Sequence, residues 1–165
     1  MKRFSALAFA LALALGAAPA LAQEFKAGDI TIDKPWSRAT PKGAEVGAGY
    51  LTIHNNGAAP DKFTGGTADF ATVEVHEMSM AGGVMKMREL KDGLVIPAHG
   101  TVTLAPNGYH LMFTGLKQPL TKGAVAKATL TFEHAGAIPV EFPVQGVGAS
   151  GDSKPKKDDM GGMKM

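Results

Sequence analysis

Four methionines and a histidine fall within fifteen residues of this sequence, in the segment VEVHEMSMAGGVMKM at positions 73–87. A second segment, His110-Leu111-Met112, again combines a histidine with a methionine. Imidazole nitrogen and thioether sulfur are both neutral donors, and the soft sulfur favours Cu(I) over Zn²⁺, Mg²⁺ or Ca²⁺. Methionine more often fills gaps in a protein core. The two segments are therefore either packing or a set of copper ligands.

The distribution of the methionines argues against packing as the sole explanation. Apart from the initiator the chain has eight, and they fall in three places. They are Met78, Met80, Met85, Met87, Met112, Met160, Met163 and Met165. Methionines that only fill core gaps would be scattered among all the strands, so their clustering favours ligands.

Strand periodicity places the candidate ligands away from the core. In a predicted strand at 71–78, apolar residues alternate on one side, which leaves His76 on the opposite face. In a predicted strand at 109–116, His110 and Met112 are likewise out of phase with the apolar positions. We therefore expect these side chains on the outer faces of their strands.

The two halves of the first segment are expected to pair as a hairpin. A turn centred at 81–82 would set His76 opposite Met87 and Met78 opposite Met85. Directly opposed residues have Cβ atoms about 4.5 to 5.5 Å apart, which is within reach of one ion. Because Ala-Gly is not a favoured two-residue turn, a longer loop with another register stays open.

The chain contains no cysteine, which narrows the chemistry further. Disulfides, thiolate nucleophiles, iron–sulfur ligation and structural zinc of the Cys type are all excluded. A blue-copper electron carrier also needs a cysteine thiolate. We therefore expect a site that binds and releases copper without serving as a blue-copper redox centre.

No enzyme motif is present, and we do not expect an enzyme. The segment His76-Glu77-x-x-Met80 lacks the second histidine of the H-E-x-x-H zinc motif and is predicted as strand. The sequence also lacks a G-x-S-x-G elbow, a P-loop, and a G-x-G-x-x-G followed by a helix.

The elements that must position these residues are short strands separated by turns. Alternating apolar residues predict strands at 30–32, 49–54, 71–78, 84–90, 94–96, 101–104, 109–116, 126–133 and 140–144. Turns are predicted at Asn55-Asn56-Gly57, Lys91-Asp92-Gly93, Pro106-Asn107-Gly108 and Ala135-Gly136. With no sustained helical period outside the N-terminus, the pattern predicts an all-β Greek-key sandwich or barrel.

Composition divides the chain into three parts. Residues 1–22 have a basic start, an Ala/Leu-rich run and the small-x-small pattern Ala20-Leu21-Ala22, which predicts a cleaved signal peptide rather than a membrane anchor. Residues 23–148 form the β domain. Residues 149–165 are predicted to be a disordered tail. Cleavage removes two of the 17 basic residues and none of the 15 acidic ones, so the neutral remainder is a poor nucleic-acid binder.

The candidate ligands resemble the copper-binding pattern of the periplasmic PCuAC copper chaperones. The resemblance rests on His76-Glu77-Met78, Met87 and His110-Leu111-Met112. It also covers PWSRAT at 35–40, GAGY at 47–50, GYHLM at 108–112 and GLK at 115–117, and spans nearly all of 30–143. The gap between Met87 and His110 is 22 residues, one more than the family spacing, which a change in an intervening turn would accommodate.

The resemblance implies a fold, a site and a role. The fold would be a cupredoxin-like β-barrel. The protein would be a monomer in the periplasm. An exposed site would hold one Cu(I) through His76, Met87, His110 and Met112. The copper would pass towards the CuA centre of cytochrome c oxidase, directly or with Sco-type proteins. Two alternatives stay open: a periplasmic copper storage or tolerance protein, and a β-sandwich interaction module without metal.

The family often carries a histidine- and methionine-rich C-terminal extension that resembles an additional copper site. Here the tail keeps Met160, Met163 and Met165 but has no histidine, so it is either a second copper site or a solubilising tail.

The remaining methionines of the first segment, Met78, Met80 and Met85, are either reserve ligands or a hydrophobic rim for a partner protein, and we favour the rim. The remaining histidines, His54, His99 and His134, lack soft donors nearby and are interpreted as ordinary surface or hydrogen-bonded residues.

Overall fold

The structure is a computed structural model that describes residues 24–151, and within them every regular element is a β-strand. The strands are β1 (Glu24–Ala27), β2 (Ile30–Arg38), β3 (Val46–Asn55), β4 (Asp61–Ala68), β5 (Ala71–Ala81), β6 (Val84–Glu89), β7 (Leu94–Ile96), β8 (Thr101–Leu104), β9 (Tyr109–Thr114), β10 (Val125–Phe132) and β11 (Gly136–Gln145). No helix in the described part could cross a membrane. The predicted signal peptide and the tail beyond residue 151 lie outside the described residues.

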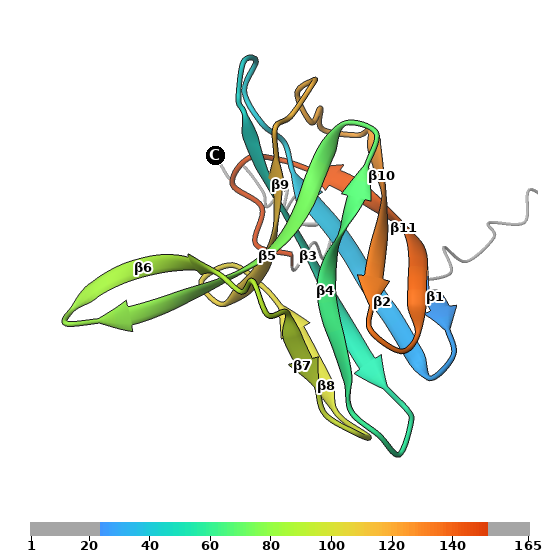
Figure 1. Cartoon of the computed structure of the whole chain (residues 1–165). Helices are drawn as coiled ribbons and strands as arrows, with labels where there is room; N and C mark the ends of the chain where they lie inside the picture. The colour runs from blue at the N-terminus through green and yellow to red at the C-terminus, as the bar shows by residue number, and fades with distance from the viewer. Residues whose placement is uncertain (1–23, 152–165) are drawn as a thin grey trace, which may run out of the picture.

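Seven of these strands close into a barrel, which confirms the predicted all-β architecture. The ring runs β2-β11-β10-β4-β5-β9-β3 and returns to β2 through the β2–β3 pairing (Figure 1). The contact between β11 and β2 is parallel, whereas the other pairings of the ring are antiparallel. Each of the remaining four strands pairs with one strand of the barrel: β1 with β2, β6 with β5, β7 with β4, and β8 with β3.

Aromatic side chains fill the barrel and fix the strands that carry the candidate ligands. Phe63 packs against Phe132 with ring centroids 5.3 Å apart, and Phe113 meets Phe142 edge-on at 5.6 Å. All four are fully buried. Phe113 belongs to β9, the strand of His110 and Met112, so its burial anchors that strand between β5 and β3.

All nine predicted strands overlap observed ones, but β1 and β4 were not predicted. Strand β4 escapes pattern recognition because Gly65 and Gly66 interrupt any apolar alternation. A Cβ on Gly66 would lie 2.2 Å from the carbonyl oxygen of Thr129 on β10, so no other residue fits there. Glycine usually weakens a strand. In β4 it lets the backbone of β10 approach closely instead.

The C-terminal end of the described chain lies along the barrel. Trp36 is buried, and its ring contacts that of Tyr50 with centroids 4.4 Å apart. A Cβ on Gly151 would lie 2.9 Å from this indole, and the Arg38 Nε donates a hydrogen bond to the carbonyl oxygen of Ala149 at 2.9 Å. The first residues of the predicted tail therefore contact the domain.

Candidate metal centre

The β5–β6 hairpin turns one residue later than the sequence suggested. Its two loop residues are Gly82 and Gly83, with φ of 59° and 78°. Positive φ at both positions is the requirement of a type I′ turn, the connection whose twist matches that of antiparallel strands. The predicted turn centre at 81–82 is therefore wrong, because a Gly-Gly pair one step further along forms the favoured loop.

The later turn changes which residues face each other. The observed pairs are His76 with Glu89, Met78 with Met87, and Met80 with Met85. The predicted pairs of His76 with Met87 and of Met78 with Met85 are wrong by two positions. A two-residue shift keeps every side chain on its original face. Met87 thus stays on the face of His76 as a diagonal neighbour, a separation of about 7 to 8 Å that long side chains can span.

Strand β9 brings the second pair of candidate ligands to the other side of β5. His110 lies directly opposite His76, and Met112 lies opposite Glu74. The two imidazole rings have centroids 5.8 Å apart. Bonds from a first-row ion to imidazole nitrogen are about 2.0 to 2.1 Å, so two imidazoles sharing an ion have ring centres about 5 to 6 Å apart. The spacing of the two rings suits a common ion.

Hydrogen bonds leave one nitrogen of His76 available for a metal. Its Nε2 lies 2.9 Å from a carboxylate oxygen of Glu74. A carboxylate only accepts hydrogen bonds, so Nε2 carries the proton and Nδ1 keeps its lone pair. That Nδ1 is buried and has no hydrogen-bond partner. A buried, unpaired imidazole nitrogen is costly unless it binds something.

His110 is fixed in the opposite tautomer. Its Nδ1 lies 3.2 Å from the carbonyl oxygen of Gly108, to which it donates, so Nε2 keeps the lone pair. Burial lowers the pKa of His110, the bond to Gly108 opposes this, and the neighbouring His76 lowers the pKa further. The neutral imidazole, which is the form that binds metals, is favoured.

The four candidate ligands differ widely in exposure. His110 and Met112 are 6% and 9% exposed, because β9 lies between β5 and β3 in the closed barrel. Met87 is 52% exposed on the edge strand β6. The expectation of an exposed site is therefore wrong for the β9 half. The arrangement is a half-buried base of imidazole and thioether with an exposed methionine at its edge.

Two residues near the site had been given no primary role. Glu74 orients His76 and is itself held by a hydrogen bond from the Thr114 hydroxyl at 3.1 Å. In the sequence, its place two residues before His76 on the same strand already indicates that the two side chains share a face. The second residue is Met78, which lies directly opposite Met87. Among the described residues, no group of three histidine or carboxylate side chains is placed to hold a metal.

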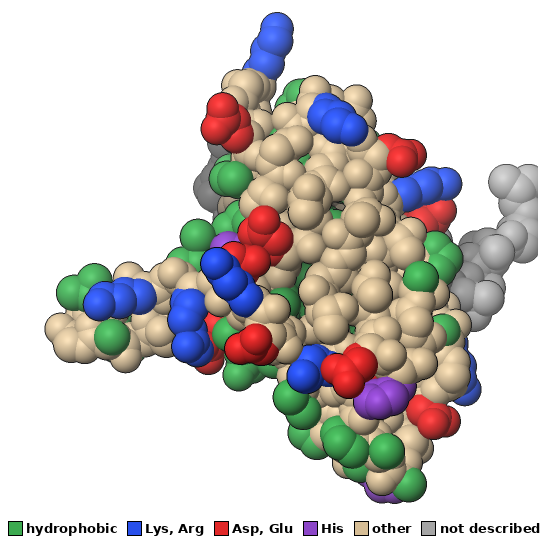
Figure 2. All heavy atoms as spheres, viewed as in Figure 1, with side chains coloured by type: hydrophobic (Ala, Val, Ile, Leu, Met, Phe, Trp, Pro, Cys, Tyr) green, Lys and Arg blue, Asp and Glu red, His purple; other side chains and the backbone are tan. Residues whose placement is uncertain are grey.

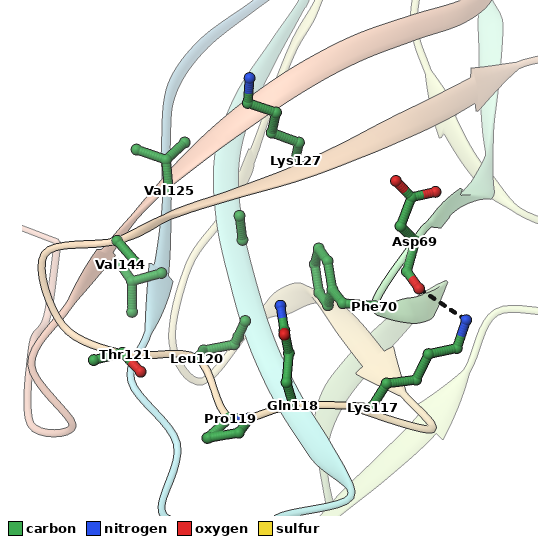
Figure 3. A pocket seen from close by; sticks show the side chains of 12 residues that line it. Asp69, Phe70, Lys117, Gln118, Pro119, Leu120, Thr121, Val125, Lys127 and Val144 are labelled. Carbon is green, nitrogen blue, oxygen red and sulfur yellow. Dashed lines mark hydrogen bonds between the residues drawn. The ribbon is translucent and has the colours of Figure 1, made fainter.

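One prominent surface hollow lies away from the residues of this cluster. This hollow of about 700 Å³ is lined by Phe70, Leu120 and Val144 among others, with the Lys117 amine donating to the Asp69 carbonyl at its edge (Figure 3). It contains neither histidine nor methionine. Of the histidines interpreted as ordinary, His54 bonds Asp33 and Thr101, and His134 bonds Asp61.

Comparison with known sequences identifies related proteins. A family model described as "Putative lipoprotein LpqE-like" matches residues 30–144. A protein of Leifsonia xyli subsp. xyli (strain CTCB07), named "Putative lipoprotein Lxx21020", is 34% identical over 121 residues. That alignment covers 73% of this chain and 72% of the relative.

Solved structures share the fold. The apo PCuAC domain of PmoF2 superposes with a TM-score of 0.65 at 26% identity, covering 78% of this chain and 98% of that domain. The copper-bound PCuAC domain of PmoF2 gives 0.63 at 29% identity, covering 75% and 98%. The Cu(I) form of DR1885 from Deinococcus radiodurans gives 0.57 at 28% identity, covering 80% and 85%. The expected cupredoxin-like fold is thereby confirmed.

Proposed function

Because the chain belongs to the LpqE-like family, the family of the PCuAC domains, we propose that it is a periplasmic metallochaperone for Cu(I). One ion is held by His76, His110, Met87 and Met112. The ion is then delivered for assembly of the CuA centre of cytochrome c oxidase, directly or through Sco-type proteins. Two structural relatives are a copper-bound PCuAC domain and the Cu(I) form of DR1885, which supports copper as the cargo.

The observation that carries the proposal is the pair of imidazoles on neighbouring strands. His76 and His110 face each other with centroids 5.8 Å apart, and the second nitrogen of each ring is bonded to a fixed acceptor. Such outer bonds are typical of metal-binding histidines because they set the tautomer and the ring orientation. Two thioethers on the same face complete a soft, neutral donor set suited to Cu(I).

Competition with a chromogenic Cu(I) chelator under anaerobic conditions tests the site. The full chain should bind one Cu(I) tightly, and His76→Ala or His110→Ala should each weaken that binding at least tenfold. His54→Ala is the matched control, because this histidine bonds Asp33 and Thr101 on another part of the barrel. Equal affinities for the three variants and the parent chain would rule out the His₂Met₂ site.

X-ray absorption of the Cu(I)-loaded chain tests the ligand set independently. We expect a mixed nitrogen and sulfur shell with two of each. Met112→Leu should remove one sulfur, and its near-conserved volume should leave the fold intact. A shell of nitrogen and oxygen alone would contradict the assignment.

Transfer to an acceptor distinguishes a chaperone from a storage protein. The Cu(I)-loaded chain is mixed with the metal-free CuA domain of cytochrome c oxidase subunit II, alone or with a Sco-type protein. After mild oxidation, the visible absorption of CuA should appear. Retention of copper on the chain in both mixtures would favour storage or tolerance.

Location is tested by cell fractionation. The relatives that carry lipoprotein names support an envelope location, and the residues at 1–22 have the pattern of a secretory signal. The processed chain should appear in the periplasmic fraction with its N-terminus at Gln23. Recovery of the unprocessed chain from the cytoplasm would contradict this part of the proposal.

A further inference from the structure

The outer half of the β5–β6 hairpin projects from the barrel as an arm. Figure 1 shows β6 and the end of β5 extending to one side, away from the other strands. In the described structure β6 pairs only with β5, and each of its six residues is exposed. The arm contributes nothing to the barrel core, so its sequence is free to serve another purpose.

The arm separates its side chains by type. Cross-strand pairing places Met78, Met80, Met85 and Met87 on one face, which is continuous with the face of His76. The opposite face carries the pairs Glu77 with Arg88 and Ser79 with Lys86. Arg88 and Glu77 form an ion pair at 2.7 Å. Figure 2 shows Lys and Arg side chains along this arm and hydrophobic side chains at its end.

The thioether face is exposed rather than packed. Met80, Met85 and Met87 are 65%, 42% and 52% exposed. Methionine that fills core gaps would be buried, so packing within this chain does not account for these side chains. Methionine also occurs at adaptable protein-binding surfaces, so these exposed thioethers suit either a contact rim or a soft-metal site.

The register brings the thioethers close enough to share an ion. Directly opposed side chains have Cβ atoms about 4.5 to 5.5 Å apart. Successive pairs on one face are about 7 Å apart along the strands. Methionine has three flexible bonds beyond Cβ, so sulfurs from both pairs can converge. After Met87 is assigned to the histidine site, three thioethers remain: Met78, Met80 and Met85.

We propose that Met78, Met80 and Met85 form a second Cu(I) site on the arm, separate from the histidine site. Thioether sulfur is soft and neutral, so the site selects a soft monovalent ion and excludes Zn²⁺ and Mg²⁺. It lacks imidazole and is weaker than the histidine site. The inference goes beyond the proposed single-ion carrier because its ligands are different.

Methionine methyl signals test the site without any substitution. The full chain, labelled with ¹³C at the methionine methyl groups, is titrated anaerobically with Ag(I), a redox-inert substitute for Cu(I). The first equivalent should shift the methyl signals of Met87 and Met112. The second should shift those of Met78, Met80 and Met85. A second phase confined to tail methyl groups, or no second phase, would overturn the proposal.

Two variants test whether the second metal-binding phase comes from the sulfurs of the arm. One removes arm sulfurs but keeps apolar area, and the other removes the tail sulfurs. Met80→Leu/Met85→Leu keeps apolar area but removes two sulfurs, so the second-phase affinity should fall at least tenfold while the first phase is unchanged. The matched control, Met160→Leu/Met163→Leu/Met165→Leu, should keep both phases. An unchanged second phase in Met80→Leu/Met85→Leu would show that the arm is not a metal site.

The titration also separates this inference from the proposed function. If the histidine site does not exist, the methyl signal of Met112 stays unshifted at every ratio, whereas the arm methyl groups still respond. If only the arm site is wrong, the first phase appears alone. ZnCl₂ at the same concentrations should shift none of the three arm signals, and a shift would contradict the assignment to a soft ion.

Discussion

Glu74 is the residue that orients the imidazole of the candidate ligand His76. Its two oxygens have separate tasks: one accepts from His76 Nε2 at 2.9 Å, and the other from the Thr114 hydroxyl at 3.1 Å. The carboxylate is therefore held in place while it holds the ring. In the proposed site His76 would therefore coordinate through Nδ1, which has no hydrogen-bond partner, and His110 through Nε2.

Replacing Glu74 tests this role. Glu74→Ala should lower Cu(I) affinity about 10- to 100-fold, the range typical of losing an outer partner of a metal-binding histidine. The matched control is Glu89→Ala. Glu89 lies opposite His76 on the other neighbouring strand, so its substitution removes the same charge at a similar place. Both affinities come from chelator competition. Equal losses in the two variants would mean that Glu74 acts through its charge alone.

Copper affinity should depend on pH through the imidazoles. Burial first, and His76 second, hold the pKa of His110 below the ordinary histidine value of about 6.5. More than half of His110 is therefore neutral at pH 6.5, and most of its share of the affinity is lost at lower pH. His110→Met substitutes a donor that does not protonate, so its affinity should fall less steeply between about pH 7 and 5. Identical slopes would contradict His110 as a ligand.

At the scale of elements, the Gly82-Gly83 turn sets the register of the arm and so the place of Met87. A Cβ added at either glycine would meet no atom within 4 Å, so space is not the constraint. The constraint is the positive φ of both residues, which disfavours any residue with a Cβ, above all a β-branched one.

Gly83→Val tests the turn. The left-handed conformation costs a β-branched residue roughly 1 to 2 kcal/mol. We expect the hairpin end to loosen and Cu(I) affinity to fall several-fold. The melting temperature should change little because β6 lies outside the core. The control is Gly28→Val, which places the same strain in the β1–β2 turn at φ 56° and should leave copper affinity unchanged. A large melting shift for Gly83→Val would mean that the arm supports the barrel.

At the scale of the whole molecule, Asp61 ties the start of β4 to the β10–β11 turn. Its carboxylate, 6% exposed as a residue, accepts backbone N–H bonds from Lys62, His134 and Ala135 at 2.7 to 2.9 Å. Burial opposes the charged form, but these hydrogen bonds outweigh burial and hold the pKa of Asp61 below its usual value. The closed barrel depends on such contacts between distant segments.

Asp61→Ala should destabilise the fold without touching the site. The variant loses three part-buried hydrogen bonds to a charged acceptor, and one such bond contributes about 0.5 to 1.5 kcal/mol or more, so we expect a loss of about 2 kcal/mol in urea unfolding at pH 7. Asp92→Ala, in an exposed turn, should change stability by less than about 0.5 kcal/mol. Copper stoichiometry should be unaffected in both variants, and its loss in Asp61→Ala would contradict the separation of fold and site.

The Asp61 contribution should also vary with pH in a defined direction. Because the folded-state pKa is below the unfolded value of about 3.9, the stabilisation is fully present above that value. It is lost as pH falls through the lower folded value. The difference between the parent chain and Asp61→Ala should therefore shrink as pH is lowered from about 5 towards 3. A difference that grows in acid would contradict the assigned pKa shift.

The sequence by itself determined the strands, the faces and the kind of ligand. Alternation of apolar residues is local, so nine strands could be predicted from it, and the period of two put His76, His110 and Met112 on their shared face. The predicted hairpin register was wrong, but by two residues, which is one full period of side-chain alternation. Met87 therefore stayed on the face of His76. Ligand softness and the absence of thiolate are properties of residue type alone.

Only the tertiary structure decided what depends on distant parts of the chain. The pairing of His76 with His110 and the burial of Met112 follow from the closure of β9 between β5 and β3. The glycine-containing β4 exists because β10 and β5 supply its hydrogen-bond partners. Hydrogen-bond partners also set which nitrogen of each histidine keeps its lone pair. Such contacts join residues far apart in sequence, so no local pattern encodes them.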